Sequence, residues 1–172
     1  TDFTIELIKE ILTEVNECRS YLDKKLEESD SAVYGINTGF GSLCDTLIPD
    51  KDLAKLQENL VMSHACGMGD LVPPEIVRLM LLLKIQSLSY GRSGIREQTL
   101  KALVDLFNHN ILPAVYELGS LGASGDLAPL AHLSLALLGQ GQVWDNGKLV
   151  VRKMYSKEEI VLLITFMIWI IL

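Results

Sequence analysis

The sequence predicts a mainly α-helical domain with a few short strands. Apolar residues recur at helical spacing along most of the 172 residues, and glycines and prolines interrupt this pattern at intervals. Apolar residues make up 49% of the chain and charged residues 22%, which is typical of a globular protein. A chain of this length buries one substantial core, so a single helical domain is expected.

The first expected helix spans about residues 5–26. Apolar side chains recur there every three or four residues, and charged or amide side chains occupy the opposite face. Asp2 or Thr4 is the expected N-cap. The segment 33–45 contains several glycines and is expected to form a loop with at most a short strand.

Prolines mark the start of the next two expected helices. The second helix begins at Pro49 and ends near Gly67. The pair Pro73 and Pro74 suits the first turn of the third helix, where a missing backbone N–H costs little. The body of that helix, residues 76–88, is apolar almost all round, which predicts a helix buried on most sides.

Two more helices and a hairpin complete the expected order. A helix spans about residues 96–109 and is ended by Pro113. Another spans about residues 127–138, with Gly139 as its stop. Residues 142–151 contain turn-forming residues between short apolar runs and predict a small hairpin.

Charge and cysteine content exclude several classes of protein. The net charge of −7 and the lack of a basic stripe argue against nucleic-acid binding. Cys18, Cys44 and Cys66 are an odd number without metal-ligand spacing, so we expect reduced thiols in a cytoplasmic protein and no metal site. We expect no secretory signal, and the start at Thr1 rather than Met leads us to expect further residues upstream.

The segment 119–132 is the most informative part of the chain. It reads Gly-Ser-Leu-Gly-Ala-Ser-Gly-Asp-Leu-Ala-Pro-Leu-Ala-His and places Ala-Ser-Gly at 123–125 before an apolar helix. For an isolated tripeptide, the ordinary interpretation is a glycine-rich turn. Ser124 or Asp126 would then cap the helix that begins at Leu127.

Two common glycine motifs do not fit. A serine-hydrolase nucleophile elbow needs a final glycine, and this chain has Asp126 at that position. A dinucleotide-binding fingerprint needs a third glycine where Cys44 stands, and no long strand precedes the segment 39–41.

Three segments together resemble one family, the aromatic amino-acid ammonia-lyases, and most closely their histidine-specific branch. The segments are Tyr-Gly-Ile-Asn-Thr-Gly-Phe-Gly at 34–41, Ser-His-Ala-Cys-Gly at 63–67, and the segment 119–132. The resemblance runs from about Ile5 to Lys148. It implies the N-terminal domain of the aspartase/fumarase-like ammonia-lyase fold over residues 1–148, followed by a divergent apolar tail over 149–172.

The resemblance implies a cofactor made from the chain itself, methylidene-imidazolone. In this family the nitrogen of the residue matching Gly125 attacks the carbonyl of the one matching Ala123, and water leaves. The hydroxyl of the residue matching Ser124 is then eliminated, which gives an electrophile that eases loss of ammonia. Gly125 has no Cβ to hinder ring closure, and Asp126 is suited to move protons.

The same resemblance assigns roles in the glycine-rich loop. A phenol is a poor base at neutral pH unless its surroundings favour the phenolate. In the family, the tyrosine matching Tyr34 removes the β-proton of the substrate, so we expect Tyr34 to act as the base. Asn37 and Gly41 are expected to shape the substrate pocket. Taken alone, an aromatic residue before a glycine loop would be core packing.

His64 is expected to contact the aromatic ring of the substrate. Histidine-specific members present Ser-His at this place. His64 therefore excludes phenylalanine better than it excludes tyrosine, and Ser63 favours histidine as the substrate. The alternative is a histidine that interacts only with the end of its helix. His132, on the helix after the tripeptide, is expected to be structural.

The resemblance therefore implies the deamination of L-histidine to trans-urocanate and ammonia, a step of histidine catabolism. Full-length members are several times longer and supply an asparagine, a glutamine, a second tyrosine, an arginine and a glutamate that this chain lacks. Their active sites are shared between subunits of a homotetramer. Two alternatives remain: a non-catalytic fragment, which we expect of the chain alone, and a tyrosine ammonia-lyase or aminomutase.

The last thirteen residues, 160–172, are apolar except for Thr165. As a helix they would reach about 20 Å, short of the roughly 30 Å hydrocarbon core of a bilayer. We therefore expect them to pack on the domain or to drive association. A membrane-surface anchor is the weaker alternative.

Overall fold

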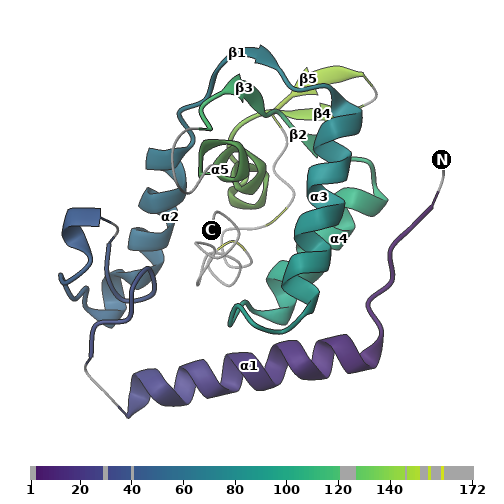
Figure 1. The fold of residues 1–172 in the computed structure, drawn as a ribbon. Coiled ribbons are helices and arrows are strands. Elements are labelled where there is room, and N and C mark those ends of the chain that lie inside the picture. The colour runs from purple at the N-terminus through teal and green to yellow at the C-terminus, as the bar shows by residue number, and fades with distance from the viewer. Residues whose placement is uncertain are drawn as a thin grey trace.

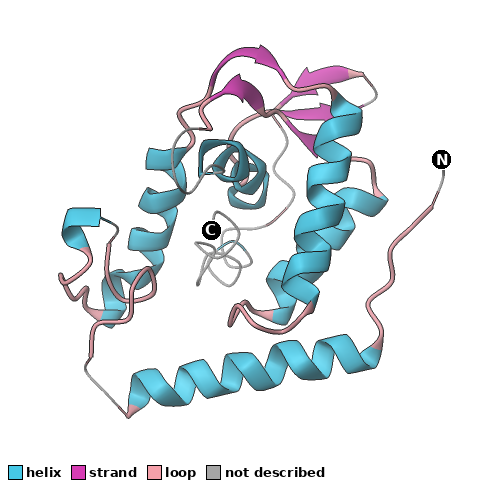
Figure 2. Ribbon diagram, in the orientation of Figure 1, coloured by secondary structure: helices cyan, strands magenta, loops and turns pink. Residues whose placement is uncertain are grey.

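The computed structural model describes residues 3–28, 31–39, 41–120, 127–145 and 147–151, together with Tyr155 and Ile160. The elements are, in order, α1 (Lys9–Glu27), η1 (Gly41–Leu43), η2 (Asp50–Asp52), α2 (Leu53–His64), β1 (Met68–Leu71), α3 (Pro74–Ser89), α4 (Glu97–Asn108), β2 (Leu112–Pro113), β3 (Tyr116–Leu118), α5 (Leu127–Leu135), η3 (Ala136–Leu138), β4 (Val143–Asp145) and β5 (Lys148–Val150). The prediction of a mainly α-helical chain with a few short strands is confirmed (Figure 2).

The core lies between the central helices. Helix α3 packs against α4, α2 packs against α5, and α1 lies across one end of the molecule in contact with α3 and α4 (Figure 1). The largest fully buried side chains come mainly from α3, α4, α5 and η3: Leu81, Leu88, Ile95, Leu100, Leu103, Leu106, Phe107, Leu133 and Leu137. Burial of these apolar side chains drives the packing of the helices.

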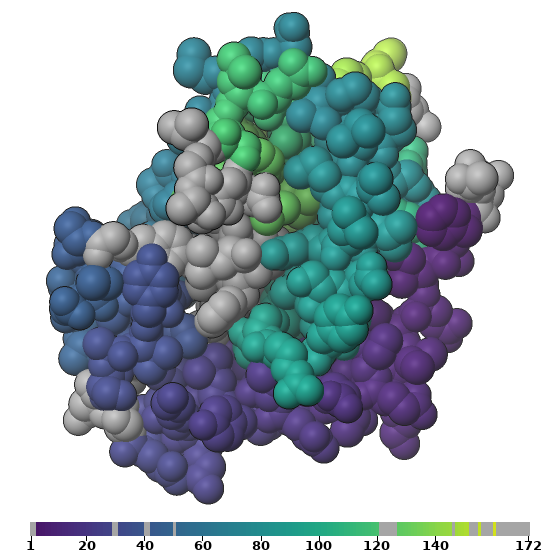
Figure 3. Space-filling view, in the orientation of Figure 1, coloured from purple at the N-terminus to yellow at the C-terminus, as the bar shows by residue number. Residues whose placement is uncertain are grey.

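Two small antiparallel sheets lie at the end of the molecule opposite α1 (Figures 1 and 3). In the first sheet, β1 pairs with β3, and Met68 lies opposite Leu118. The second sheet has the order β2-β4-β5. The hairpin expected at residues 142–151 is confirmed, because β4 and β5 pair from Val143 with Val150 to Asp145 with Lys148.

Most expected helices lie where the sequence places them. Helix α2 follows Pro49 and η2 and ends at His64, close to the expected end. Helix α4 is within one residue of its expected bounds. Helix α5 and η3 together span 127–138, and Gly139 stops them with φ of 65°. The loop expected at 33–45 is made of turns, one bridge and η1.

The expected start of the first helix is wrong. Helix α1 begins at Lys9 and has no side-chain cap, so Thr4 does not cap it, and Asp2 lies outside the described residues. The backbone N–H of Ile5 donates to Asn108 Oδ1 at 2.8 Å, and Asn108 Nδ2 donates to the Ile5 carbonyl at 2.9 Å. This distant asparagine satisfies the backbone groups that a helix would have used.

The third helix begins as expected but is less buried than expected. Pro74 is its first residue, in the position where proline is tolerated. Only one face is covered by described neighbours, and Ile76, Leu79 and Leu83 are 47%, 49% and 55% exposed. The prediction of a helix buried on most sides is therefore wrong for the described chain.

Five described residues lie in the expected C-terminal tail: Leu149, Val150, Val151, Tyr155 and Ile160. Tyr155 and Ile160 pack against the core, and the Tyr155 hydroxyl donates to the Ala102 carbonyl at 3.5 Å. Most of the expected tail lies outside the described residues, so the division at residue 148 stays a prediction. Across the described helices, none has both the length and the apolar character needed to cross a membrane.

Two leucines give a matched test of this packing. Leu103→Ala should lower the free energy of unfolding by about 2–5 kcal/mol, because it leaves a cavity in the core. Leu79→Ala, on the outer face of α3, should cost less than about 1 kcal/mol. Urea unfolding of both variants measures the difference, and equal losses would contradict the assignment of that outer face.

Candidate functional site

Tyr34 lies in a turn between α1 and α2 that the side chain of Asn37 holds in shape. Asn37 Oδ1 accepts a hydrogen bond from the Val33 N–H at 2.7 Å, and Asn37 Nδ2 donates to the Ser31 carbonyl at 3.1 Å. Gly41 begins η1 just beyond this turn. The Tyr34 side chain is 51% exposed, so the alternative that it is core packing is wrong.

Gln57 of α2 fastens the Tyr34 turn to the helix. Its side chain is buried, and Nε2 donates to the carbonyl of Gly35 at 3.1 Å and lies 3.5 Å from that of Ile36. Gln57 is not among the site residues expected from the sequence. Its spacing in the sequence could have identified it, because Gln57 lies one helical turn from both Leu53 and Val61. An amide side chain buried beside such apolar residues needs hydrogen-bond partners.

His64 is the last residue of α2, two turns beyond Gln57. Its Nδ1 lies 2.7 Å from the Leu60 carbonyl, which only accepts hydrogen bonds, so Nδ1 carries the proton and donates. The Ser63 hydroxyl donates to the same carbonyl at 3.0 Å. In the neutral ring Nε2 is then the acceptor. Helix α2 therefore connects the Tyr34 turn, which is bound by Gln57, to His64 at the end of the helix.

The two ends of the segment that contains the tripeptide lie against each other. Gly119 has φ of 153°, and a Cβ there would be 2.9 Å from the Ala128 Cβ and 3.0 Å from the Gly67 Cα. Glycine avoids both the strain and the clash. We call this contact of Gly119 with Gly67 and with Ala128 the stem junction. It brings the chain just after His64 to Gly119, at one end of the tripeptide segment, and brings Gly119 to Ala128, at the other end.

His132 of α5 contacts the stem junction at Gly67. The Gly67 N–H donates to His132 Nε2 at 2.9 Å. The imidazole ring stands edge-on to Tyr116, with ring centroids 5.1 Å apart. Burial lowers the pKa of His132, which favours the neutral ring with an acceptor at Nε2.

The tripeptide Ala123, Ser124 and Gly125 and the adjacent Asp126 lie outside the described residues, so their roles stay predictions. The residues around them can still be tested for fit. The stem junction, built from two glycines and an alanine, brings the chain on the two sides of this segment close together with almost no side-chain bulk between them. This arrangement is compatible with a group formed from the backbone of the segment itself.

The described residues include no group of three or more His, Cys, Asp or Glu side chains that could hold a metal ion. Cys18, Cys44 and Cys66 are free thiols. The arrangement thus offers a phenol, an imidazole and a tightly joined backbone segment as its chemical groups.

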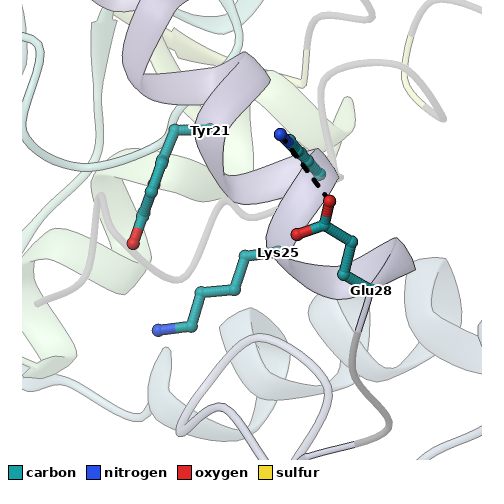
Figure 4. Close-up of a pocket in the computed structure, with 4 residues that line it drawn as sticks. Tyr21, Lys25 and Glu28 are labelled. Atoms are coloured by element: carbon teal, nitrogen blue, oxygen red, sulfur yellow. Dashed lines mark ion pairs between the residues drawn. The ribbon is translucent and has the colours of Figure 1, made fainter.

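A surface pocket of about 420 Å³ near the end of α1 contains none of the predicted site residues. It is lined by Tyr21, Lys24, Lys25 and Glu28 (Figure 4). Lys24 and Glu28 form an ion pair at 3.6 Å with both side chains well exposed. Water screens such a pair, so it contributes little to stability or selectivity. We assign this pocket no role.

Comparison with known proteins places this fold and site in a family. The family model for aromatic amino acid lyases matches residues 2–161. The histidine ammonia-lyase of Legionella pneumophila is 54% identical over 127 residues, which cover 74% of this chain and 25% of the relative. The chain therefore belongs to the aromatic amino acid lyase family. It spans only about a quarter of the length of the curated relatives it matches.

Solved structures agree with this assignment. The crystal structure of histidine ammonia-lyase from Trypanosoma cruzi has a TM-score of 0.76 and 37% identity, covering 88% of this chain and 28% of that one. Phenylalanine aminomutase of Pantoea agglomerans has a TM-score of 0.79 and 30% identity, covering 87% and 28%. The ammonia-lyase fold expected from the sequence is confirmed.

The lowered pKa of His132 predicts a pH-dependent stability. The folded chain binds fewer protons at this ring than the unfolded chain, so the stabilisation is complete above the unfolded value of about 6.5 and is lost as the pH falls toward the folded pKa. Urea unfolding between about pH 7.5 and pH 5.5 should show a steeper loss in the wild-type chain than in His132→Gln. Equal slopes in the two proteins would contradict the prediction.

Proposed function

We propose that the chain is part of a histidine ammonia-lyase, which converts L-histidine to trans-urocanate and ammonia in histidine catabolism. Family membership and the histidine ammonia-lyases among its relatives support the reaction class. The observation that carries the proposal is the stem junction. It brings the chain after His64 to Gly119, where the segment that holds Ala-Ser-Gly begins, and joins Gly119 to Ala128 beyond its end.

In this proposal Ala123, Ser124 and Gly125 form methylidene-imidazolone, with Asp126 as the group that moves protons. The ring, once formed, supplies the electrophile that ordinary side chains lack. The chain's own residues hold the segment that forms it. The stem junction fixes both ends, and the start of α5 directs its N-terminal dipole toward the segment, which favours developing negative charge there.

Tyr34 is the proposed base that removes the β-proton of the substrate. Its exposure and its place in a braced turn support this role, because a base must reach the substrate from a fixed position. Asn37 and Gln57 hold the backbone on either side of Tyr34. In the proposed site Asn37 and Gly41 shape the substrate pocket through this loop.

His64 is the proposed contact for the imidazole ring of the substrate. Its Nδ1 is committed to the Leu60 carbonyl, which makes Nε2 the acceptor of the neutral ring. An N–H of a substrate imidazole pairs with such an acceptor, whereas phenylalanine offers no donor. A tyrosine hydroxyl also fits, and tyrosine aminomutases are among the structural neighbours. A tyrosine lyase or aminomutase is therefore the second candidate.

We assign the activity to an assembly in the cytoplasm rather than to this chain alone. The chain spans about a quarter of its curated relatives, so it supplies one share of the groups that act on the amino-acid substrate. The half-exposed apolar face of α3 supports association into a homo-oligomer, a homotetramer by family resemblance. The three free thiols support a reducing compartment.

Intact-mass measurement tests ring formation. The purified chain should be lighter than its sequence mass by two water molecules, since ring closure and serine elimination each release one. Ser124→Ala has no hydroxyl to eliminate and should lack this deficit. Ser120→Ala, a neighbouring serine outside the tripeptide, is the control and should keep it. A wild-type chain at full sequence mass would contradict ring formation.

A chimera tests the substrate. Residues 5–148 of this chain would replace the matching part of the Legionella pneumophila enzyme, to which the chain is 54% identical. We expect urocanate formation from L-histidine and much less turnover of L-tyrosine. Tyr34→Phe in the chimera should lower kcat by roughly 10²–10⁴-fold, the usual contribution of a general base. Preferred turnover of tyrosine would instead support the second candidate.

A further inference from the structure

The loop between α3 and α4 lies directly on helix α1. A Cβ at Gly91 would be 2.8 Å from the carbonyl carbon of Glu14, and one at Gly94 would be 2.6 Å from Cδ2 of Leu22. Both glycines also have positive φ, of 62° and 68°. These close contacts fix the path of the loop, and with it the position of Arg96, the residue just before α4.

The guanidinium of Arg96 has a buried donor without an acceptor. The side chain as a whole is partly buried, but its Nε is fully enclosed, and the described chain offers this atom no hydrogen-bond partner. None of the ion pairs that the described residues form includes Arg96. An unpaired buried donor and an unpaired charge both cost folding free energy. A bound ion is one explanation for such a group.

A second arginine stands beside Arg96. Arg19 of α1 is only 8% exposed, and its Nη1 donates to the Gly94 carbonyl at 3.4 Å, two residues before Arg96. Both carboxylate oxygens of Asp23 accept from Arg19, one from Nε at 2.8 Å and the other from Nη2. Asp23 therefore balances the charge of Arg19. Burial lowers the pKa of Arg96, and the charge of Arg19 lowers it further, although Asp23 raises it.

The acidic residue that follows Arg96 already has partners on other residues. The Glu97 carboxylate accepts from Asn16 Nδ2 at 2.5 Å and forms an ion pair with Lys101. We call Arg19, Asp23 and Arg96 the Arg96 site. One positive charge of this site remains uncompensated.

We propose that the Arg96 site binds a carboxylate group, which Arg96 contacts and Arg19 attracts. A carboxylate carries the single negative charge that the site lacks, and its two oxygens match the parallel N–H bonds of a guanidinium. A phosphate monoester carries nearly two negative charges and would place the excess beside Asp23. No hydrogen bond within the described chain has to break for the Arg96 Nε to turn toward the ligand.

Two sources can supply this carboxylate: a free small acid, or an aspartate or glutamate side chain of a second copy of the chain. The Arg96 site contains none of the residues assigned to the proposed reaction. Its test therefore needs no turnover, and its failure would leave the proposed function untouched.

Nitrogen-15 NMR of the Arg96 Nε–H group tests binding in the unsubstituted chain. The probe is sodium acetate, exchanged for sodium chloride at constant ionic strength. The Arg96 resonance should shift and reach a plateau in the millimolar range of acetate, as expected for one paired guanidinium. Inorganic phosphate should bind more weakly. The resonance of Arg92, an exposed arginine of the same loop, should not reach a plateau. The same response at both arginines would overturn the proposal.

Substitutions separate the planar guanidinium from its charge. Arg96→Lys keeps the charge but loses the paired N–H bonds, so acetate should bind about tenfold more weakly. Arg96→Met should not bind acetate. Arg92→Met is the matched control, because it removes a positive charge from the same loop, and it should bind acetate as the wild-type chain does. Acetate should raise the midpoint of thermal unfolding in the control and leave it unchanged in Arg96→Met.

The stability of Arg96→Met in chloride alone tests the premise that Arg96 has no internal partner. Removal of an unpaired, partly buried charge should leave the midpoint of urea unfolding unchanged or raise it. A large fall in this midpoint would show that Arg96 is satisfied within the chain and would overturn the proposal. Acetate that stabilises Arg96→Met as much as the wild-type chain would overturn it as well.

Dilution distinguishes the two sources of the carboxylate. If a second copy supplies it, the Arg96 resonance in chloride should change with protein concentration. Sedimentation should then show association that Arg96→Met abolishes and Arg92→Met keeps. If a free acid is the ligand, the resonance should not depend on protein concentration, and acetate alone should move it to a plateau. A resonance that responds neither to acetate nor to protein concentration would overturn the proposal.

Discussion

The close approach of Gly67, Gly119 and Ala128 is the constraint on which the arrangement of the candidate site depends. These residues have almost no side chain, so backbone from three parts of the chain meets directly. The approach is held by a hydrogen bond from Gly67 to His132 and by the packing of α2 on α5. A larger residue at either glycine would separate the helix that ends in His64 from the segment that carries Ala-Ser-Gly.

Polar side chains, two of them buried, fix the backbone at each part of the site. Asn37 shapes the turn around Tyr34, Gln57 ties that turn to α2, and His132 ties the end of the α2 segment to α5. Each of these groups satisfies a backbone donor or acceptor that would otherwise be buried unpaired or left to water. The groups proposed to act on the substrate therefore stand on a braced backbone, which is how precise geometry is usually obtained.

Local signals predicted the elements well because the cause of each element is local. Pro74 stands at the start of α3 and Gly139 ends η3, and both are visible in the sequence. The start of α1 was missed because Asn108, more than a hundred residues away, satisfies the backbone of Ile5. The exposure of α3 depends on what covers it, and the role of Gln57 depends on a loop that folds back onto α2. No local pattern contains that information.

The pairing of Ile5 with Asn108 also ties the segment before α1 into the fold. Its two hydrogen bonds attach this segment to the end of α4, so it is a structural part of the domain. Trimming the protein to the first helical residue would leave the asparagine amide without these partners and loosen the end of α4. Any shortened version for crystallography or display should therefore retain the residues from Phe3 onward.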